Sequence, residues 1–358
     1  MERYGLSDMS TRQDKKSVLV TGGCGFIGVN LAARLLGTGS FAVTVLDNMS
    51  TGSAADLEAA LSEHGLDHSE VTVVEGDVRD LAACEEACWG IDAVVHLAAQ
   101  AGVPQSIDNP LLDADVNVRG TLNMLEVSRW AGAGMFVFAS SNAPLGAALP
   151  PSREDTAPRP LSPYGAAKLA GEGYCSAYYA SYSLPTVALR FSNAYGPWSL
   201  HKSSVVARFI KDGLSTGRLT VYGNGSQTRD LVHVDDITRA IELTLDSNPE
   251  ETAGGIFQLG TGVETAVLQV AAIVADLIGE GIRIDFAPAR PGEASRSFSY
   301  IGKARELLEY APEVTLREGI AETLEWFRAH GGPALMRRPP AEIIVRDEKR
   351  LLRSRKPG

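Results

Sequence analysis

The sequence contains little cysteine and no long apolar segment. Its four cysteines, at positions 24, 84, 88 and 175, lack the Cys-x-x-Cys spacing of zinc and redox motifs, and no nearby histidine completes a metal-binding set. We therefore expect reduced thiols and no metal site. The first 15 residues are polar, without the apolar core of a signal peptide, and no stretch approaches the roughly 20 apolar residues that span a membrane. These absences predict a cytoplasmic protein that does not enter the membrane.

The sequence also has fewer positively charged than negatively charged residues. The chain has 33 Lys and Arg against 44 Asp and Glu, which gives a formal net charge of −11. A general nucleic-acid binder neutralises phosphates with clustered Lys and Arg, so this balance argues against nucleic acid as a partner. The remaining composition, 44% hydrophobic and 22% charged residues, is ordinary for a globular protein. At 358 residues the chain is long enough for one large two-lobed domain or two modest domains.

Short apolar strands alternate with helical stretches over the first half of the chain. After a first strand, SVLV, strand-like runs occupy 41–47, 71–77, 93–99, 135–141 and 185–191. Strands that are buried on both faces of a parallel sheet give such continuous apolar runs, and helices connect them. From about residue 192 the pattern loosens into loops rich in Gly, Ser and Pro, with a helical stretch near 203–214. We predict an α/β fold, with a doubly wound parallel sheet and a smaller C-terminal lobe.

A glycine motif, TGGCGFIG at 21–28, lies between the first strand and the first helix. In this context Gly22 permits a tight turn, Gly25 lets the backbone approach a pyrophosphate, and Gly28 allows the helix to pack closely. The N-terminus of the helix carries a partial positive charge that favours phosphate groups. The motif therefore predicts a Rossmann-type dinucleotide-binding site.

Two downstream carboxylates bear on the choice of dinucleotide. Asp47 closes the second strand, where a carboxylate can accept both adenosine ribose hydroxyls and would repel a 2′-phosphate. Residues 48–52 contain no Arg or Lys to bind such a phosphate, which favours NAD over NADP. Asp77, at the end of the third strand, has two interpretations that the sequence leaves open. It either hydrogen-bonds the adenine amine or caps the helix that follows.

Tyr164 and Lys168 lie four residues apart in the segment SPYGAAK, so on a helix they share one face. A lysine ammonium near a phenol, together with a positively charged nicotinamide, favours the phenolate and lowers a tyrosine pKa from its reference value of about 10. Because the pair follows a dinucleotide motif in the chain, we predict that both residues are catalytic.

At these residues the chain resembles the extended short-chain dehydrogenase/reductase family of nucleotide-sugar epimerases, dehydratases and decarboxylases. The resemblance runs from about Ser17 to Arg328 in the family's order. It rests on TGGCGFIG, HLAAQAGV, NVRGTLNMLE, FASSNAPLG, YGAAK, RFSNAYGP, QTRDLVHVDD and RPGE. It implies an enzyme with NAD as cofactor and a UDP-sugar as substrate.

The resemblance also implies a set of site residues. Ser141, in the family's catalytic Ser/Thr position before Gly146, would act with Tyr164 and Lys168, and Lys168 would also hold the nicotinamide ribose. The implied cofactor contacts are Gly22, Gly25, Phe26, Ile27, Gly28, Asp47, Asn48, Asp77, Val78, Leu97, Ala98, Ala99, Tyr164 and Lys168. The implied substrate contacts are Ser106, Asn117, Ser141, Asn142, Asn193, Val206, Tyr222, Arg229, Arg290 and Glu293.

The resemblance gives roles to several of the substrate contacts. It places Asn193 near the diphosphate, Tyr222 against the uracil, Arg229 and Arg290 on the phosphates, and Glu293 on the uridine ribose. Arginine suits phosphate because its planar donors bind two oxygens at once and stay protonated. Alternatives stay open for three of these residues. Asn117 braces the site from a helix or is a buried structural amide, and either arginine could instead form a surface salt bridge.

These motifs divide the chain into four parts. We expect a flexible leader at 1–15, an NAD-binding Rossmann domain with the catalytic residues at 16–191, a nucleotide-sugar lobe interleaved with it at 192–332, and a basic tail at 333–358. The tail is either a solvated terminus or a docking segment. Helices near 111–129 and 164–182 carry apolar residues on more than one face. Because family members pair such helices in a four-helix bundle, we expect a homodimer.

Departures from the family pattern distinguish the reactions. In 4,6-dehydratases Asp-Glu follows the catalytic Ser/Thr and performs water loss, whereas Asn142-Ala143 stand here, which disfavours dehydration. Decarboxylases of UDP-glucuronate usually keep a glutamate in the place of Ala143, which weakens that alternative too. HLAAQAGVPQSIDNP is most similar to UDP-glucuronate 4-epimerases, although residues 199–202 replace their Arg-Pro-Asp segment and Pro144-Leu145 replace a common Val-Tyr. We predict a UDP-sugar 4-epimerase that acts through a transient 4-keto sugar, with UDP-glucuronate among the candidate substrates. The alternatives are a UDP-glucuronate decarboxylase and a non-catalytic NAD-binding scaffold.

Overall fold

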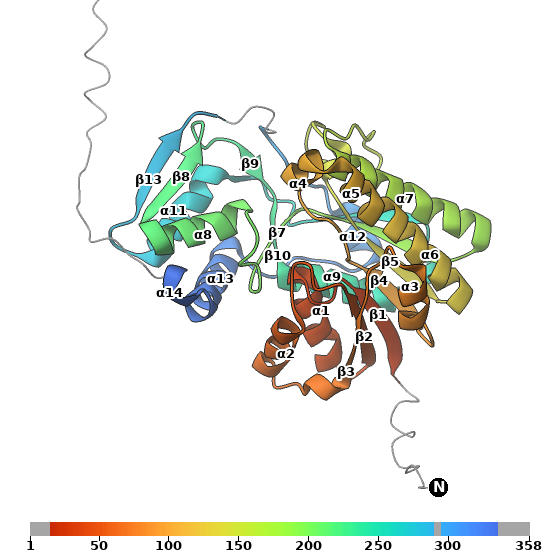
Figure 1. The fold of residues 1–358 in the computed structure, drawn as a ribbon. Coiled ribbons are helices and arrows are strands. Elements are labelled where there is room, and N and C mark those ends of the chain that lie inside the picture. The colour runs from red at the N-terminus through yellow and green to blue at the C-terminus, as the bar shows by residue number, and fades with distance from the viewer. Residues whose placement is uncertain (1–14, 290–294, 336–358) are drawn as a thin grey trace, which may run out of the picture.

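The computed structural model describes residues 15–289 and 295–335, and its centre is a parallel sheet of seven strands (Figure 1). In sheet order the strands are β11 (Gly255–Leu259), β6 (Thr186–Phe191), β5 (Met135–Ser141), β4 (Ala93–His96), β1 (Lys16–Thr21), β2 (Phe41–Asp47) and β3 (Val71–Glu75). The chain builds outward from β1 in both directions, which is the order of a doubly wound sheet. The predicted α/β, Rossmann-type fold is confirmed.

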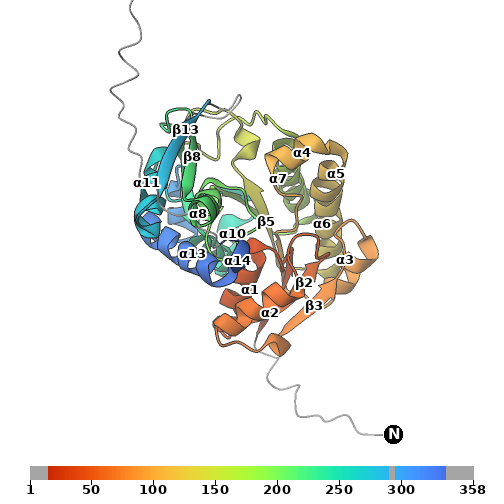
Figure 2. The ribbon, with the colours of Figure 1, turned by 60° about the vertical axis from the view of Figure 1, so that its left-hand side comes forward.

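Helices cover both faces of this sheet, which explains why its strands are apolar throughout. Val18 and Val20 of β1 belong to the core shared with α1 (Phe26–Gly37), α2 (Ala54–Glu63), α9 (Val234–Asp246) and α12 (Gly302–Leu307). Leu19, which points the other way, belongs to the core shared with α3 (Leu81–Ala87), α6 (Gly120–Ala131) and α7 (Pro163–Tyr182). Figure 2 shows these two helical layers on opposite sides of the sheet.

Shorter elements link the sheet to its helices. They are the 3-10 turns η1 (His68–Glu70) and η3 (Ala143–Leu145), the π-helical turn η2 (Asp115–Arg119), α4 (Val103–Asp108), α5 (Pro110–Ala114) and α10 (Pro249–Thr252). Of these, α4, α5 and η2 pack against α7 and so lie over the catalytic segment.

A smaller lobe is built around a third apolar cluster. Its helices are α8 (Val205–Thr216), α11 (Val267–Ile278), α13 (Leu316–His330) and α14 (Gly332–Leu335). Its strands pair as β8 (Arg218–Tyr222) with β13 (Arg283–Ala287), β7 (Asn193–Tyr195) with β10 (Leu231–His233), and β9 (Thr228–Arg229) with β12 (Thr265–Ala266). Between these segments the chain returns to the sheet, because β11 pairs with β6 and α9 packs on α1.

The sequence motifs meet at one edge of the sheet. Thr21, Asp47, His96 and Ser141 are the last residues of β1, β2, β4 and β5. In a parallel sheet the carboxyl ends of the strands lie side by side, and ligands of doubly wound folds bind outside this edge. The fold therefore brings the predicted cofactor motifs and the predicted catalytic serine together.

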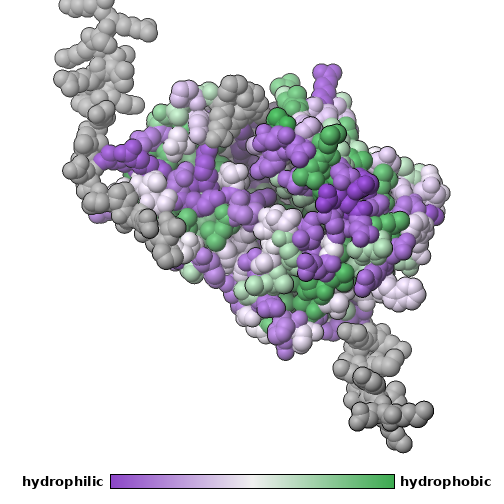
Figure 3. All heavy atoms as spheres, viewed as in Figure 1, coloured by the Kyte–Doolittle hydropathy of each residue, from purple (hydrophilic) through white to green (hydrophobic). Residues whose placement is uncertain are grey.

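The cysteines and the surface also agree with the sequence analysis. All four cysteines are free and buried. No helix among the described residues has the length and apolar character to cross a membrane, and hydrophilic and hydrophobic residues are intermixed on the face shown in Figure 3. Nearly all of the expected leader and of the basic tail, residues 1–14 and 336–358, lies outside the described residues.

Candidate active site

The glycine motif forms a tight turn between β1 and α1. Gly22 has a φ of +70°, and a Cβ on it would lie 2.8 Å from the backbone nitrogen of Ala98. A Cβ on Gly28 would lie 2.3 Å from the carbonyl oxygen of Gly22. Both positions therefore require glycine, as predicted, although Gly28 packs against the turn itself rather than against the strand. Sequence reasoning missed Gly52, whose added Cβ would lie 1.7 Å from the Cys24 carbonyl oxygen.

Asp47 is buried at the end of β2 and faces this turn. One carboxylate oxygen accepts from the Cys24 N–H at 2.9 Å and the other from the Met49 N–H at 2.9 Å. Each oxygen keeps a lone pair, so the carboxylate can still accept ribose hydroxyls. Asp47 thus has a structural role in the turn in addition to its predicted contact with the ribose, which stays a prediction.

Asp77 lies beside Asn48 and Arg79 rather than at a helix end. Its carboxylate accepts from the Arg79 guanidinium at 2.7 Å and from the Asn48 amide at 2.8 Å. The hydrogen bonds and charge of Arg79 hold the pKa of Asp77 well below its usual range. The cap of α3 is Asp80, whose side chain accepts from the Ala82 N–H at 3.0 Å. The interpretation of Asp77 as a helix cap is therefore wrong, while the adenine contact stays a prediction.

The loop after β4 is held against the glycine turn. Leu97 N–H donates to the Thr21 carbonyl at 3.1 Å, and Ala98 N–H donates to the Thr21 hydroxyl at 3.2 Å. Ala99 follows in the same loop, and Val78, which follows β3, is buried with the helices of this face. The predicted cofactor contacts of β1, β2, β3 and β4 thus surround one turn.

Ser141, Tyr164 and Lys168 lie where β5 meets the start of α7. Ser141 ends β5, and its hydroxyl accepts from the Ala143 N–H at 2.9 Å and is a hydrogen-bond partner of the Tyr164 phenol. Tyr164 lies in the first turn of α7, which begins after Ser162 with Pro163 as its first residue. Lys168, one turn later, donates to the Ala139 carbonyl at 2.8 Å, and its ammonium lies 5.9 Å from the centroid of the Tyr164 ring. The structure brings the predicted triad together.

Burial sets the protonation of this triad in the protein alone. It raises the pKa of Tyr164 to about 12, although the hydrogen bond from Ser141 opposes the shift. It lowers the pKa of Lys168 to about 8, with nearby Asp113 opposing. The expected lowering of the tyrosine pKa by Lys168 is therefore not met by the protein's own groups, because burial is the largest effect on the pKa of each group. The expectation also included the positively charged nicotinamide, and the lowering of the tyrosine pKa must come from that charge.

The helix bearing the catalytic pair is anchored to the sheet by a buried ion pair. Arg190 of β6 donates from Nε and Nη2 to the two oxygens of Glu172 on α7, both at 2.8 Å. Ser140, the neighbour of Ser141, donates to the same carboxylate at 2.5 Å. This network fixes α7 relative to β5 and β6, and so fixes Tyr164 relative to Ser141.

Asn142 and Ala143 provide no acid or base beside Ser141. The Asn142 amide nitrogen donates to the hydroxyls of Ser192 and Ser299 at 3.2 and 3.0 Å. Ser299 donates in turn to the Gln258 side-chain oxygen, so the amide nitrogen of Asn142 must face the serines. After them, Pro144 and Leu145 form the buried 3-10 turn η3.

Two predicted substrate contacts are occupied with structural hydrogen bonds. The Asn117 oxygen accepts from the Gln100 N–H at 2.9 Å, and its nitrogen donates to the Gln100 carbonyl at 3.1 Å and to Asp113 at 2.9 Å. Asn117 therefore braces the loop after β4. Ser106 is fully buried in α4 and donates to the Val103 carbonyl at 2.8 Å. Their contact with substrate stays a prediction.

The smaller lobe contributes a cavity of about 130 Å³. It brings together four predicted contacts, namely Asn193, Val206, Tyr222 and Arg229. Sequence reasoning missed Arg208 and Ser204, which also line it. The Arg208 guanidinium lies 5.2 Å from the centroid of the Tyr222 ring, and Ser204, the residue that precedes α8, places the N-terminus of that helix at the cavity. Predicted Arg290 and Glu293 lie outside the described residues.

Comparison with known proteins agrees with this geometry. Residues 18–260 match the model of the NAD dependent epimerase/dehydratase family. The chain belongs to this family. The UDP-glucose 4-epimerase of Mycolicibacterium smegmatis is 37% identical over 87% of this chain and 98% of its own length. UDP-glucuronic acid decarboxylase 1 of Xenopus tropicalis is 30% identical over 91% of this chain and 76% of its own length.

A solved structure gives the same result for the fold. The UDP-glucuronic acid 4-epimerase of Bacillus cereus, in complex with UDP-glucuronic acid and NAD, is 29% identical, covers 87% of this chain and 99% of its own, and superposes with a TM-score of 0.79. The predicted family membership is confirmed. The chain is an enzyme of the epimerase/dehydratase family, and NAD is its cofactor.

The carboxyl edge of the sheet fits this cofactor. A Cβ added to Gly25 would meet only the Gly22 carbonyl oxygen, at 3.3 Å, so the backbone is open there to a ligand. Gly25 also caps α1 without a side chain, and the first turn of α1 carries no acidic residue, which leaves its N–H groups available to a pyrophosphate. The residues present therefore suit NAD in the family.

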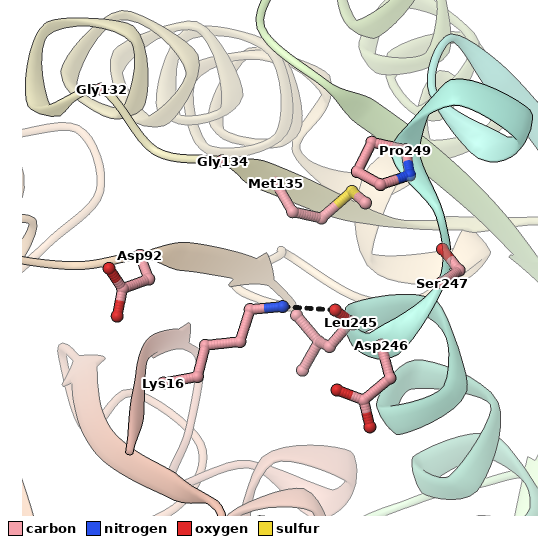
Figure 4. Close-up of a pocket in the computed structure, with 9 residues that line it drawn as sticks. All are labelled: Lys16, Asp92, Gly132, Gly134, Met135, Leu245, Asp246, Ser247 and Pro249. Atoms are coloured by element: carbon pink, nitrogen blue, oxygen red, sulfur yellow. Dashed lines mark hydrogen bonds between the residues drawn. The ribbon is translucent and has the colours of Figure 1, made fainter. Parts of the chain in front are cut away.

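A larger cavity, of about 510 Å³, lies at the opposite edge of the sheet (Figure 4). Lys16 opens β1, Asp92 precedes β4, and Met135 opens β5, so this cavity is at the amino ends of the strands. The Lys16 ammonium donates to the Leu245 carbonyl. None of the family motifs reaches this edge among the described residues, so the cavity is separate from the candidate active site.

Proposed function

We propose that this family member is an NAD-dependent UDP-sugar 4-epimerase that acts through a transient 4-keto sugar. The observation that carries the proposal is the complete Ser141, Tyr164 and Lys168 group next to Asn142 and Ala143, which hold no acid or base. Oxidation at C4 is thus provided for, while the water loss of a dehydratase is not. The similar UDP-glucose 4-epimerase of M. smegmatis supports the same reaction.

In this proposal the cofactor lies along the carboxyl edge of the sheet. Its pyrophosphate meets the N-terminus of α1 at Gly25, Phe26 and Ile27, and its adenosine ribose meets Asp47. Lys168 holds the nicotinamide ribose. When bound, NAD would accept a hydride from C4 of the sugar and return it to the same carbon.

The protein moves the proton that accompanies this hydride. Tyr164 takes the C4 hydroxyl proton at its phenolic oxygen and returns it after the sugar has turned over. Ser141, which is hydrogen-bonded to the phenol, orients the reacting oxygen. Lys168 lies one helical turn away, and its positive charge favours the phenolate once the positively charged nicotinamide is beside it.

The nucleotide of the substrate occupies the cavity of the smaller lobe. The N-terminus of α8 points a partial positive charge at this cavity, and Ser204 brings a buried hydroxyl that has no protein partner within the described residues. Arg208 and Arg229 add guanidinium groups suited to a diphosphate. Tyr222 offers an aromatic face to the uracil.

Two features bear on the sugar. The segment HLAAQAGVPQSIDNP and the B. cereus structure support UDP-glucuronate as one candidate. The decarboxylase of X. tropicalis keeps UDP-glucuronate decarboxylation as the second candidate reaction, which begins with the same C4 oxidation. A non-catalytic scaffold is the least favoured, because the triad is intact.

We also propose that the enzyme is a cytoplasmic homodimer. Its four cysteines are free, which suits a reducing compartment. Aromatic residues are exposed along α6 and α7, with Trp130 at 52% and Tyr182 at 53% of their full exposure, and Tyr174 and Tyr179 lie on the same helix as Tyr182. Exposed large aromatics on neighbouring helices are typical of an interface.

A panel of UDP-sugars tests the proposed function. The enzyme with NAD is incubated separately with UDP-glucose, UDP-galactose, UDP-N-acetylglucosamine and UDP-glucuronate, and the products are resolved by NMR. The proposal predicts inversion at C4 for at least one of them with no loss of carbon. Release of a UDP-pentose from UDP-glucuronate would select the decarboxylase, and no turnover of any sugar would favour the scaffold.

A further inference from the structure

Lys202 has an ammonium group for which the described residues supply no counter-charge. It lies at the end of the segment 196–202, which leads from β7 into α8. Its ammonium group forms no hydrogen bond or ion pair with any residue that the structure describes. Burial lowers its pKa, and no carboxylate of the described residues opposes that shift. A cation placed in this way is stabilised by an anionic ligand.

The position of Lys202 is set by its backbone rather than by its own side chain. Lys211 of α8 donates to the carbonyl oxygens of Leu200 and Lys202, at 2.9 and 2.6 Å. Asn30 of α1 donates to the Pro197 carbonyl at 3.4 Å, which holds the start of the segment against the Rossmann body. Both ends of the segment are therefore fixed, and the ammonium group of Lys202 takes no part in these hydrogen bonds.

The ammonium group lies near the side chain that begins α1. Its nitrogen is 5.8 Å from the centroid of the Phe26 ring, and Phe26 is the first residue of that helix. Because α1 has no side-chain cap and no acid in its first turn, the helix end and the lysine bring two positive groups to the same place. The same place was assigned above to the cofactor pyrophosphate.

We propose that Lys202 binds the pyrophosphate of NAD and completes, from the smaller lobe, the site that the glycine motif begins. The inference rests on the proposed placement of the cofactor at Gly25, Phe26 and Ile27. It also gives a role to the segment 199–202, which departs from the glucuronate epimerase pattern. Because Ser203 and Ser204 line the nucleotide cavity, one stretch of chain contacts both the cofactor and the substrate.

Calorimetric titration of the full-length chain with NAD⁺, adenosine and UDP tests this role. Lys202→Met should weaken NAD⁺ binding by about tenfold or more, since hydrogen bonds to charged groups contribute that much. Adenosine binding should not change, because adenosine has no phosphate. Lys202→Arg should restore NAD⁺ affinity. Added salt should weaken NAD⁺ binding more steeply in the wild type than in Lys202→Met.

Lys303→Met is a matched control. Lys303 also lies over a phenylalanine, 4.3 Å from the Phe257 ring centroid, and donates to the Ile256 carbonyl at 2.9 Å, away from the glycine motif. Its loss should leave NAD⁺ affinity unchanged. An effect of Lys303→Met as large as that of Lys202→Met would overturn the proposal, because loss of net charge would then explain both.

Three other outcomes would contradict the proposal. If the NAD⁺ affinity of Lys202→Met were within twofold of the wild type, Lys202 would not contact the pyrophosphate. Weaker binding of UDP in place of NAD⁺ would assign the ammonium to the substrate diphosphate. If Lys202→Met weakened the binding of adenosine as much as that of NAD⁺, the substitution would have displaced the loop. Asp47→Ala separates the inference from its premise. If Asp47→Ala weakens NAD⁺ binding and Lys202→Met does not, only the inference about Lys202 fails. If neither variant weakens NAD⁺ binding, the proposed placement of the cofactor fails as well.

Discussion

Tyr164 and Lys168 carry the proposed chemistry, and burial acts on both of them. In the protein alone the phenol has a pKa of about 12 and the ammonium a pKa of about 8. Each value favours the uncharged form of its group. The phenolate therefore depends on the positive charge of the oxidised cofactor, which couples proton removal to the presence of NAD⁺ rather than NADH.

Tyr164→Phe tests the role of the phenol. We expect the fold and NAD⁺ binding to persist, while turnover falls by roughly 10² or more, because a positioned acid-base group contributes about 10²- to 10⁴-fold. Tyr174→Phe, on the exposed side of the same helix, is the control and should turn over normally. The measurement is kcat on the best UDP-sugar, and near wild-type turnover in Tyr164→Phe would remove the tyrosine from the mechanism.

Asp47→Ala tests the choice of dinucleotide. The change removes the ribose acceptor and the repulsion of a 2′-phosphate, so the ratio of NAD⁺ to NADP⁺ affinity should fall. It also removes the acceptor for the Cys24 and Met49 N–H groups, so some loss of stability is expected. Titration with both dinucleotides gives the ratio. An unchanged ratio would show that the carboxylate does not contact the ribose.

Single residues could be predicted from the sequence where a motif fixes both type and spacing. Gly22 and Gly28 were identified because only glycine fits a tight turn under a helix, and Ser141 because of its place in the family pattern. Gly52, Arg208 and Lys202 were missed, because each acts through a neighbour that is distant in the chain. No local pattern shows that the 48–53 loop touches Cys24, or that a lysine of the smaller lobe reaches α1.

At the level of elements, a buried hydrogen-bond chain joins β1, β4 and α6 beneath the cofactor turn. Thr121 of α6 donates to the Asn117 carbonyl at 2.7 Å, so its oxygen must accept from Nε2 of His96 at 3.1 Å. Nδ1 of His96 then accepts from the Thr21 hydroxyl at 2.7 Å. The partners thus assign the neutral tautomer with the proton on Nε2. Burial lowers the pKa of His96 to about 3.

His96 should therefore make the fold sensitive to acid. The folded protein keeps the ring neutral, while the unfolded chain takes up a proton below its ordinary pKa of about 6.5. Stability is fully present above that value and is lost as the pH falls toward about 3, by up to about 1.4 kcal/mol per pH unit.

The measurement is the free energy of unfolding of wild type and His96→Phe by urea at a series of pH values between 7 and 4. The variant should be less stable at pH 7, because two hydroxyls lose a partner, but it should lose less stability on acidification. Parallel pH dependences would show that His96 does not titrate between the two states.

The elements differ in how far the sequence could predict them. Strands at 41–47 and 135–141 have the predicted bounds, because continuous apolar runs between turn residues leave little choice. The strand expected at 93–99 ends at His96, since the residues after it turn out of the sheet to meet Thr21. The sequence left two roles open for Asp77, a contact with the adenine or the cap of the next helix. Asp80 is the cap, because Asp77 is engaged by Arg79 and Asn48.

At the scale of the whole molecule, the two lobes are built from interleaved segments of the chain. β11 and α9 come from the second half of the sequence and complete the sheet and its helical layer, while the segments around them build the cavity proposed for the nucleotide. The sequence pattern predicted that the chain loosens in this region but not which of its strands joins which sheet. Pairing between β6 and β11 depends on residues more than 60 positions apart, which no local pattern reports.

The proposed dimer is tested by light scattering. At micromolar concentration the wild type should have twice the mass of its 38.0 kDa chain, because the exposed aromatics of α6 and α7 would be covered by a second copy. Trp130→Glu combined with Tyr182→Glu should shift the mass toward the monomer by placing charge in the interface. A monomer mass for the wild type would contradict the dimer.

The central claim is that hydride leaves C4 and returns to C4 within one active site. The direct test is NMR of the product from a UDP-sugar deuterated at C4, with a parallel reaction of unlabelled sugar in deuterated water. The account predicts an inverted product that keeps its C4 deuterium and takes no solvent deuterium at any carbon. The contradicting result is a product without inversion at C4 that contains solvent deuterium. The deuterium would lie at C6 for a dehydratase, or at C5 with loss of carbon dioxide for a decarboxylase.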